Sequence, residues 1–119
     1  MRGVILFAHG SRDPRWRDPM DAVAQRMRAD DPTTAVACAF LELAAPDIAT
    51  AATDLIADGA DSLRVVPMFL GMGKHAREDL PELIATLRAA HPDVPISVAR
   101  AVGEETEVTE LLSRLALRD

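Results

Sequence analysis

The chain has 119 residues, with 13 basic and 19 acidic side chains and a formal net charge of −6. This length predicts one domain, residues 1–119, large enough to bury a core without disulfides. The acidic balance argues against nucleic acid or an anionic membrane as the main partner, and an aromatic content of 3% argues against base-stacking surfaces. Cys38 is the only cysteine, and no apolar run reaches the roughly 18 residues of a membrane helix. We therefore expect a cytoplasmic protein without disulfides.

Short apolar segments alternate with helical patterns along the whole chain. Strands are expected at residues 3–8, 35–41, 63–68 and 95–99. Helices are expected from Asp18-Pro19 to Asp30, from Pro46 to Gly59, from Leu80-Pro81 to His91, and over 104–117. This order predicts an α/β fold, a doubly wound four-stranded parallel sheet with helices on both faces.

All four expected helices carry apolar residues at helical spacing, and the first and last are examples. In the first helix the stripe consists of Met20, Val23, Ala24 and Met27, and in the last it consists of Val108, Leu111, Leu112 and Leu115. The stripe of the last helix is expected to be buried.

Titratable side chains follow the ends of the predicted strands. His9 comes after the first strand, Glu42 after the second, and His75 after the third and a glycine-containing loop. Ligands of open α/β sheets bind beyond the carboxyl ends of the strands. Imidazoles with a carboxylate suit a divalent metal such as iron, cobalt, nickel or zinc, so this edge is the candidate site.

Each of these residues also has a purely structural interpretation. Glu42 fits an exposed position before a helix, and His91 fits a helix C-terminus, where its charge meets the dipole. Asp79 most simply caps a helix that begins at Leu80, with Glu82 completing a capping box. If that helix instead begins near His75, the i,i+4 spacing places Asp79 beside His75 and lets it orient the imidazole.

Positive charge is concentrated near the same strand ends. Arg12, Arg15 and Arg17 outnumber the acids of residues 9–18, and Lys74 and Arg77 lie in an acid-free stretch, residues 70–77. Arginine side chains bind carboxylates through paired hydrogen bonds. These residues therefore predict an anionic ligand with several carboxylates, although a solvated arginine loop remains the alternative.

Three segments resemble the motifs of the class II tetrapyrrole chelatases of the sirohydrochlorin type. They are Leu6-Phe-Ala-His-Gly-Ser-Arg-Asp-Pro14, Phe40-Leu-Glu-Leu-Ala-Ala-Pro46 and Val66-Pro-Met-Phe-Leu-Gly-Met-Gly-Lys-His-Ala-Arg-Glu-Asp-Leu-Pro81, with Gly103-Glu104 in the expected place after the fourth strand. The resemblance spans nearly the whole chain, and the length resembles that of the short, single-domain branch. It implies insertion of Co²⁺, Fe²⁺ or Ni²⁺ into sirohydrochlorin, with the metal as substrate and no organic cofactor.

The resemblance also implies roles for individual residues. His9 and His75 would bind the incoming metal and help to remove two pyrrole protons, and Glu42 would assist near the metal path. By position, the candidates for holding the substrate carboxylates are Ser11, Arg12, Arg15, Lys74 and Arg77. Because such a site needs two walls, we expect a homodimer with the cleft between the protomers.

Two other functions stay open on the sequence. The same residues would serve a metal or tetrapyrrole carrier without turnover. A hydrolase using Ser11 is weaker, because the spacing around Ser11 is not that of a G-x-S-x-G nucleophile elbow.

Overall fold

A four-stranded parallel sheet forms the centre of the computed structural model, which describes all 119 residues. The strands β1 (Arg2–Ala8), β2 (Ala35–Phe40), β3 (Ser62–Pro67) and β4 (Ile96–Val98) lie in the order β2-β1-β3-β4, and every neighbouring pair is parallel. Strand β1 pairs on both sides, which explains why its apolar run carries no alternating polar residues.

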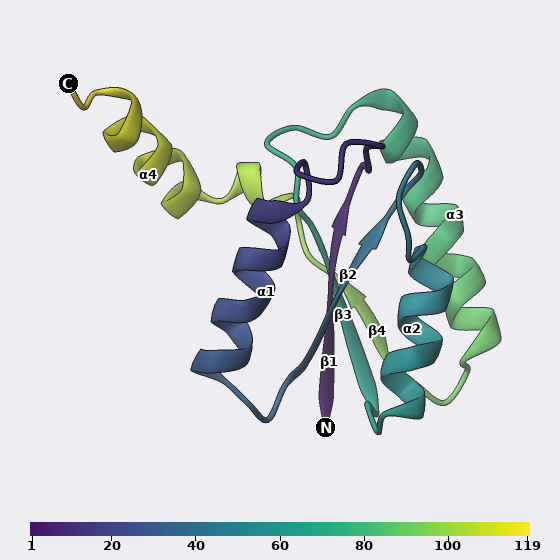
Figure 1. The fold of residues 1–119 in the computed structure, drawn as a ribbon. Coiled ribbons are helices and arrows are strands. Elements are labelled where there is room, and N and C mark those ends of the chain that lie inside the picture. Colours follow the sequence, from purple (N-terminus) through teal and green to yellow (C-terminus); the bar gives the residue numbers. More distant parts are fainter.

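Helices cover both faces of this sheet, as the sequence predicts. In Figure 1, α2 (Ile48–Ala57) and α3 (Lys74–Ala90) lie on one face and α1 (Asp18–Asp30) lies on the other. A short 3₁₀ helix, η1 (Val102–Glu104), leads into the last helix, α4 (Thr106–Ala116). The doubly wound α/β architecture is therefore confirmed.

Two apolar clusters, one on each face of the sheet, form the core. The larger lies between the sheet and α2 and α3, and the smaller lies between β1, β2 and α1. Phe7 stands edge-on to Phe69 with 6.2 Å between ring centroids. Apart from such rings the core is aliphatic, in keeping with the composition. Cys38 lies in the smaller cluster, and burial raises the pKa of its thiol.

The start of α3 differs from the simpler sequence interpretation. The helix begins at Lys74, with Gly73 in extended backbone before it, and Pro81 lies in its interior. Asp79 is therefore not an N-cap, and the capping prediction is wrong. The proline and the capping-box pattern suggested a later start, but the residues before Pro81 already form two helical turns.

The predicted burial of the α4 stripe is also wrong. No residue of α4 is buried, and Leu111, Leu112 and Leu115 are 46%, 41% and 43% exposed. Figure 1 shows α4 projecting from the rest of the chain, on the α1 side. The Cα radius of gyration is accordingly 14.7 Å, against about 13.5 Å for a compact chain of this length.

The α1 stripe is only partly buried. Met20 and Ala24 are buried, but Val23 is 38% exposed. Val23 of α1 and the apolar stripe of α4 are therefore both left exposed by this chain. None of the helices is long and apolar enough to span a membrane.

Candidate metal and tetrapyrrole site

His9 and Glu42 meet at the carboxyl edge of the sheet, which is the edge where the four parallel strands end. His9 directly follows β1, Glu42 lies two residues after β2, and His9 Nε2 lies 3.0 Å from Glu42 Oε1. The backbone holds them in place, because Glu42 N–H donates to the His9 carbonyl at 3.0 Å. Both side chains are nearly half exposed, so a ligand above the sheet can reach them.

Gly10 makes this close approach possible. Its φ is +107°, and a Cβ at this position would lie 1.7 Å from the carbonyl oxygen of Glu42. Only glycine combines that backbone conformation with the required space. The glycine of the first motif therefore brings the β1 and β2 loops together.

A second histidine–carboxylate pair lies at the start of α3. His75 Nε2 is 3.2 Å from Asp79 Oδ2, one helical turn further along. The early start of α3 creates this pair and agrees with the i,i+4 alternative that the sequence left open. The imidazole is 61% exposed and the carboxylate 38%, so this pair is also open to solvent.

The two pairs are separate. No three histidine, cysteine, aspartate or glutamate side chains come together in a group that could hold a metal. Each imidazole instead has one carboxylate, which can orient the ring and stabilise it when it gains a proton. The arrangement offers two proton acceptors rather than one closed metal cage.

Arg12 and Arg15 are exposed and form no ion pair with a carboxylate of the chain. The loop that carries them is held by hydrogen bonds to the side chains of Ser11 and Asp13. Ser11 Oγ accepts the Asp13 N–H at 3.1 Å, and Asp13 Oδ1 accepts the Arg15 N–H at 2.9 Å. Both guanidinium groups therefore remain available for a ligand anion.

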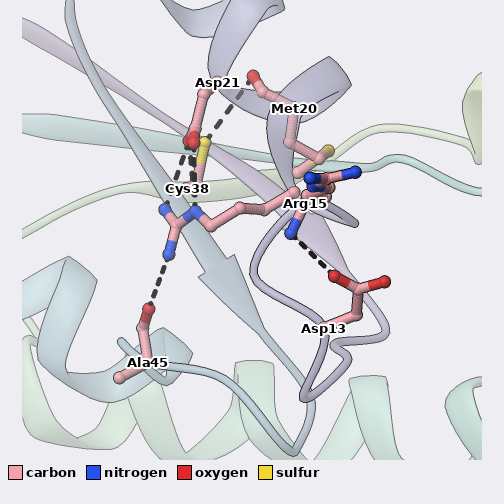
Figure 2. Close-up of polar contacts among 7 residues, drawn as sticks. Asp13, Arg15, Met20, Asp21, Cys38 and Ala45 are labelled. Atoms are coloured by element: carbon pink, nitrogen blue, oxygen red, sulfur yellow. Dashed lines mark hydrogen bonds and ion pairs between the residues drawn. The ribbon is translucent and has the colours of Figure 1, made fainter.

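Arg17 differs from its neighbours because its guanidinium is already engaged. It pairs with Asp21 at 3.1 Å, donates to the Ala45 carbonyl at 3.1 Å, and lies 4.8 Å from the centre of the Phe40 ring. Figure 2 marks the hydrogen bonds that reach Asp21 and Ala45, with Cys38 nearby. Arg17 therefore links the end of the β1–α1 loop to α1 and to the β2–α2 loop.

Lys74 and Arg77 lie in the first turn of α3, next to His75. Lys74 Nζ approaches Glu78 at 3.9 Å with its side chain 82% exposed, and Arg77 has no carboxylate partner. Both are therefore placed to meet a ligand at the carboxyl edge.

A single chain does not enclose this site. None of its surface hollows is lined by His9 or His75. The most apolar hollow lies close by and includes Trp16, which sequence reasoning missed. A lone tryptophan in an otherwise polar arginine loop was the available signal.

The sequence matches the model of the CbiX family over residues 3–118. It is 31% identical over 118 residues to a sirohydrochlorin cobaltochelatase of Saccharolobus solfataricus, covering 94% of this chain and 91% of that protein. It is 32% identical to a sirohydrochlorin ferrochelatase of Bacillus subtilis, covering 92% of this chain but only 42% of that protein.

Two solved structures extend the comparison to three dimensions. A CbiX protein from Marinobacter aquaeolei, described as a cobalamin biosynthesis protein, superposes with a TM-score of 0.83 at 31% identity, covering 98% of this chain and 94% of that one. The sirohydrochlorin chelatase SirB of Bacillus subtilis in complex with cobalt superposes with a TM-score of 0.79 at 30% identity, covering 96% of this chain and 49% of that one.

Proposed function

The chain belongs to the CbiX family, and on that basis we propose that it is a sirohydrochlorin chelatase that inserts Co²⁺, Fe²⁺ or Ni²⁺ into the tetrapyrrole. The observation that carries the proposal is the presence of two histidine–carboxylate pairs at one open edge of the sheet. Relatives named as cobaltochelatases and a ferrochelatase support both the substrate and the class of metal.

The chemistry of metal insertion suits two separate pairs. One divalent ion replaces two pyrrole N–H protons, so two protons must leave the macrocycle for each metal that enters. We assign one proton to His9 with Glu42 and the other to His75 with Asp79, since a neutral imidazole beside a carboxylate is a good acceptor. Asp79 acts through His75 by orienting its ring.

The same imidazoles are the residues we assign to the incoming metal. A neutral imidazole is a good ligand for iron, cobalt and nickel, and it can bind either the metal or a proton at one nitrogen, not both. We therefore propose that His9 and His75 contact the ion first and accept protons after it has moved toward the macrocycle. The metal is a substrate in this scheme, and no organic cofactor takes part.

The cations around the edge are proposed to hold the substrate carboxylates. Arg12 and Arg15 approach from the β1–α1 loop, and Lys74 and Arg77 approach from α3. Ser11 is the remaining candidate for a hydrogen bond to the substrate. An acidic protein with an arginine-rich rim would favour a small polycarboxylate over nucleic acid or a membrane surface.

We further propose that the working unit is a cytoplasmic homodimer. The chain corresponds to about half of the SirB chain, and its own surface leaves the histidines open. A second copy would supply the opposite wall of a cleft. A free buried cysteine agrees with a reducing compartment.

The test is anaerobic incubation of the protein with excess sirohydrochlorin and each of Co²⁺, Fe²⁺ and Ni²⁺, followed by absorption. We expect several turnovers per protomer with at least one metal, above the rate without protein. Binding of one equivalent without further turnover would favour the carrier function. No binding and no rate with any metal would contradict both.

A further inference from the structure

Leu43 is the one residue other than glycine whose backbone has a positive φ. The angle is +64°, in the left-handed region. A residue with a bulky side chain is rarely found there, because its Cβ crowds the adjacent carbonyl oxygen, whereas glycine and asparagine adopt this conformation more readily. Backbone strain of this kind is concentrated at functional sites, where the surrounding structure maintains it. Leucine is therefore an unfavourable residue for the backbone at this position.

Packing of the Leu43 side chain within the chain does not offset this strain. Leu41 packs against the larger apolar cluster and Ala44 against the smaller one, but Leu43 belongs to neither and is 49% exposed. Single exposed apolar residues are common on protein surfaces, so exposure alone carries no meaning. At Leu43, exposure is combined with a backbone conformation that disfavours leucine. Contacts within the chain therefore do not account for a leucine here.

The position of Leu43 in the fold points to the candidate site. Leu43 directly follows Glu42, whose carboxylate lies 3.0 Å from His9 Nε2 and whose N–H donates to the His9 carbonyl. The left-handed residue turns the chain immediately after this contact. The β2–α2 loop that contains it lies at the top of Figure 1, at the same end of the sheet as the start of α3. A ligand that reaches the His9–Glu42 pair therefore lies beside Leu43.

We propose that Leu43 contacts the apolar face of the sirohydrochlorin macrocycle next to the His9–Glu42 pair. The inference rests on the proposed function and deepens it. The substrate is a flat ring with carboxylates at its rim, and the residues assigned to it so far are polar or charged. An aliphatic side chain against the ring face removes apolar surface of both partners from water. Substrate binding would then offset the backbone strain at Leu43.

This role predicts that stability and binding respond differently to substitution. Leu43→Asn relieves the strain, because asparagine tolerates the left-handed region, so the variant should be at least as stable as wild type. The same change replaces the apolar contact by a polar amide and should weaken substrate binding. Leu43→Gly removes the side chain without adding a polar group. Leu43→Met is the matched control, because it keeps both the strain and an apolar side chain of similar volume.

The experiment compares these three variants with wild type in four measurements on the full chain. Urea denaturation gives the free energy of unfolding. Anaerobic titration with metal-free sirohydrochlorin, followed by the absorption of the macrocycle, gives its dissociation constant. Titration with Co²⁺ alone gives the affinity for the metal without the tetrapyrrole. Sedimentation velocity at the titration concentration shows whether assembly has changed, and steady-state rates of Co²⁺ insertion separate KM from kcat.

We expect Leu43→Asn and Leu43→Gly to raise the dissociation constant of sirohydrochlorin and the KM by about 3–10-fold, the scale of losing part of a buried leucine. Leu43→Met should behave like wild type. Sedimentation, kcat and the affinity for Co²⁺ should be unchanged in all variants, because Leu43 is assigned to the ring and not to the metal or the protons. The Asn variant should combine weaker binding with undiminished stability.

Equal dissociation constants for sirohydrochlorin in wild type, Leu43→Asn and Leu43→Gly would overturn the inference and leave the proposed function intact. An Asn variant that is clearly less stable than wild type would also overturn it, because the leucine would then serve the fold. Weaker binding together with a changed sedimentation coefficient would place Leu43 between copies of the chain and would count against the ring contact. A wild type that binds no sirohydrochlorin would contradict the proposed function as well as this inference.

Discussion

At the scale of single residues, the His9–Glu42 contact depends on a backbone that only glycine can adopt. Gly10 has a φ of +107° and lies against the backbone carbonyl of Glu42 in the loop after β2. The sequence placed His9 and Glu42 at one edge because both follow parallel strands. It could not show that they touch, since the contact depends on the direction of each loop after its strand has ended.

Gly10→Ala should therefore lower the free energy of unfolding and also disrupt the His9–Glu42 contact. The alanine would take on a left-handed conformation costing about 1–3 kcal/mol, and its Cβ would lie 1.7 Å from the Glu42 carbonyl oxygen. Chemical denaturation should show the loss in the free energy of unfolding. Gly71→Ala is the control, because nothing lies within 4 Å of a Cβ there. Equal stability of the two variants would contradict the role assigned to Gly10.

The free arginines predict an effect on substrate binding rather than on turnover. Arg12→Ala and Arg77→Ala should each raise the KM for sirohydrochlorin by about 10-fold or more, since a hydrogen bond to a charged group contributes about 1.5–3 kcal/mol. Arg26→Ala is the control, because Arg26 already pairs with Asp30 at 3.1 Å. Steady-state rates over a range of sirohydrochlorin concentrations separate KM from kcat. A fall in kcat at unchanged KM would contradict substrate binding by these arginines.

At the scale of elements, the start of α3 decides what Asp79 does. The local pattern around Pro81 fits a helix that begins there, yet α3 begins at Lys74. A proline inside a helix costs about 3 kcal/mol, which favoured a later start, but tertiary packing can override such local preferences. Here Leu80, Ile84 and Leu87 are all buried against the sheet.

Asp79→Asn should lower the rate of metal insertion by about 10–100-fold, the range for residues that orient a metal-binding imidazole. The fall should appear in kcat rather than in the KM for sirohydrochlorin, because Asp79 contacts His75 and is not among the residues assigned to the substrate. Glu78→Gln is the control, since Glu78 faces Lys74 instead. A rate that falls only through a higher KM, with kcat unchanged, would contradict the positioning role of Asp79.

The start of α2 makes a prediction about stability and pH. Asp47 caps this helix by accepting the Thr50 N–H at 2.8 Å, and that hydrogen bond holds the pKa of Asp47 below its ordinary value of 3.8. Because the pKa is lowered by folding, the stabilisation is complete above the unfolded value and is lost as the pH falls through the folded one.

Asp47→Ala should therefore reduce the free energy of unfolding by about 1 kcal/mol at neutral pH. The deficit should shrink below about pH 4, where the wild-type carboxylate takes up a proton. Urea denaturation at several pH values measures the difference. Asp47→Asn keeps a capping oxygen and should track wild type at neutral pH. A deficit in the Ala variant that stays constant down to pH 2 would contradict the charge contribution.

At the scale of the whole molecule, the sequence predicted the sheet and the covering of its faces but misplaced the last helix. The four strands and their parallel pairing follow from apolar runs separated by helical patterns. The α4 stripe was predicted to be buried because periodicity identifies an apolar face without saying which chain covers it. The stripe of Val108, Leu111, Leu112 and Leu115 is a regular apolar face, and this chain leaves it uncovered.

A homodimer with a shared cleft predicts that activity depends on protein concentration. Specific activity per protomer should fall as the protein is diluted through its dimer dissociation constant, since a lone chain leaves both histidine pairs uncovered. The rate of metal insertion and the sedimentation coefficient, measured on the same dilution series, would show whether the fall in specific activity coincides with dissociation of the dimer. Specific activity that stays constant while the dimer dissociates would contradict the shared cleft.

The central claim is that the imidazoles of His9 and His75 carry out metal insertion. Its most direct test is the rate of Co²⁺ insertion into sirohydrochlorin when both imidazoles are removed. The double variant His9→Ala, His75→Ala should lose at least about 100-fold in kcat/KM, the scale of general acid–base catalysis. His91→Ala should keep the wild-type rate, because His91 lies at the far end of α3. A double variant that inserts cobalt as fast as wild type would show that the chemistry lies elsewhere in the protein.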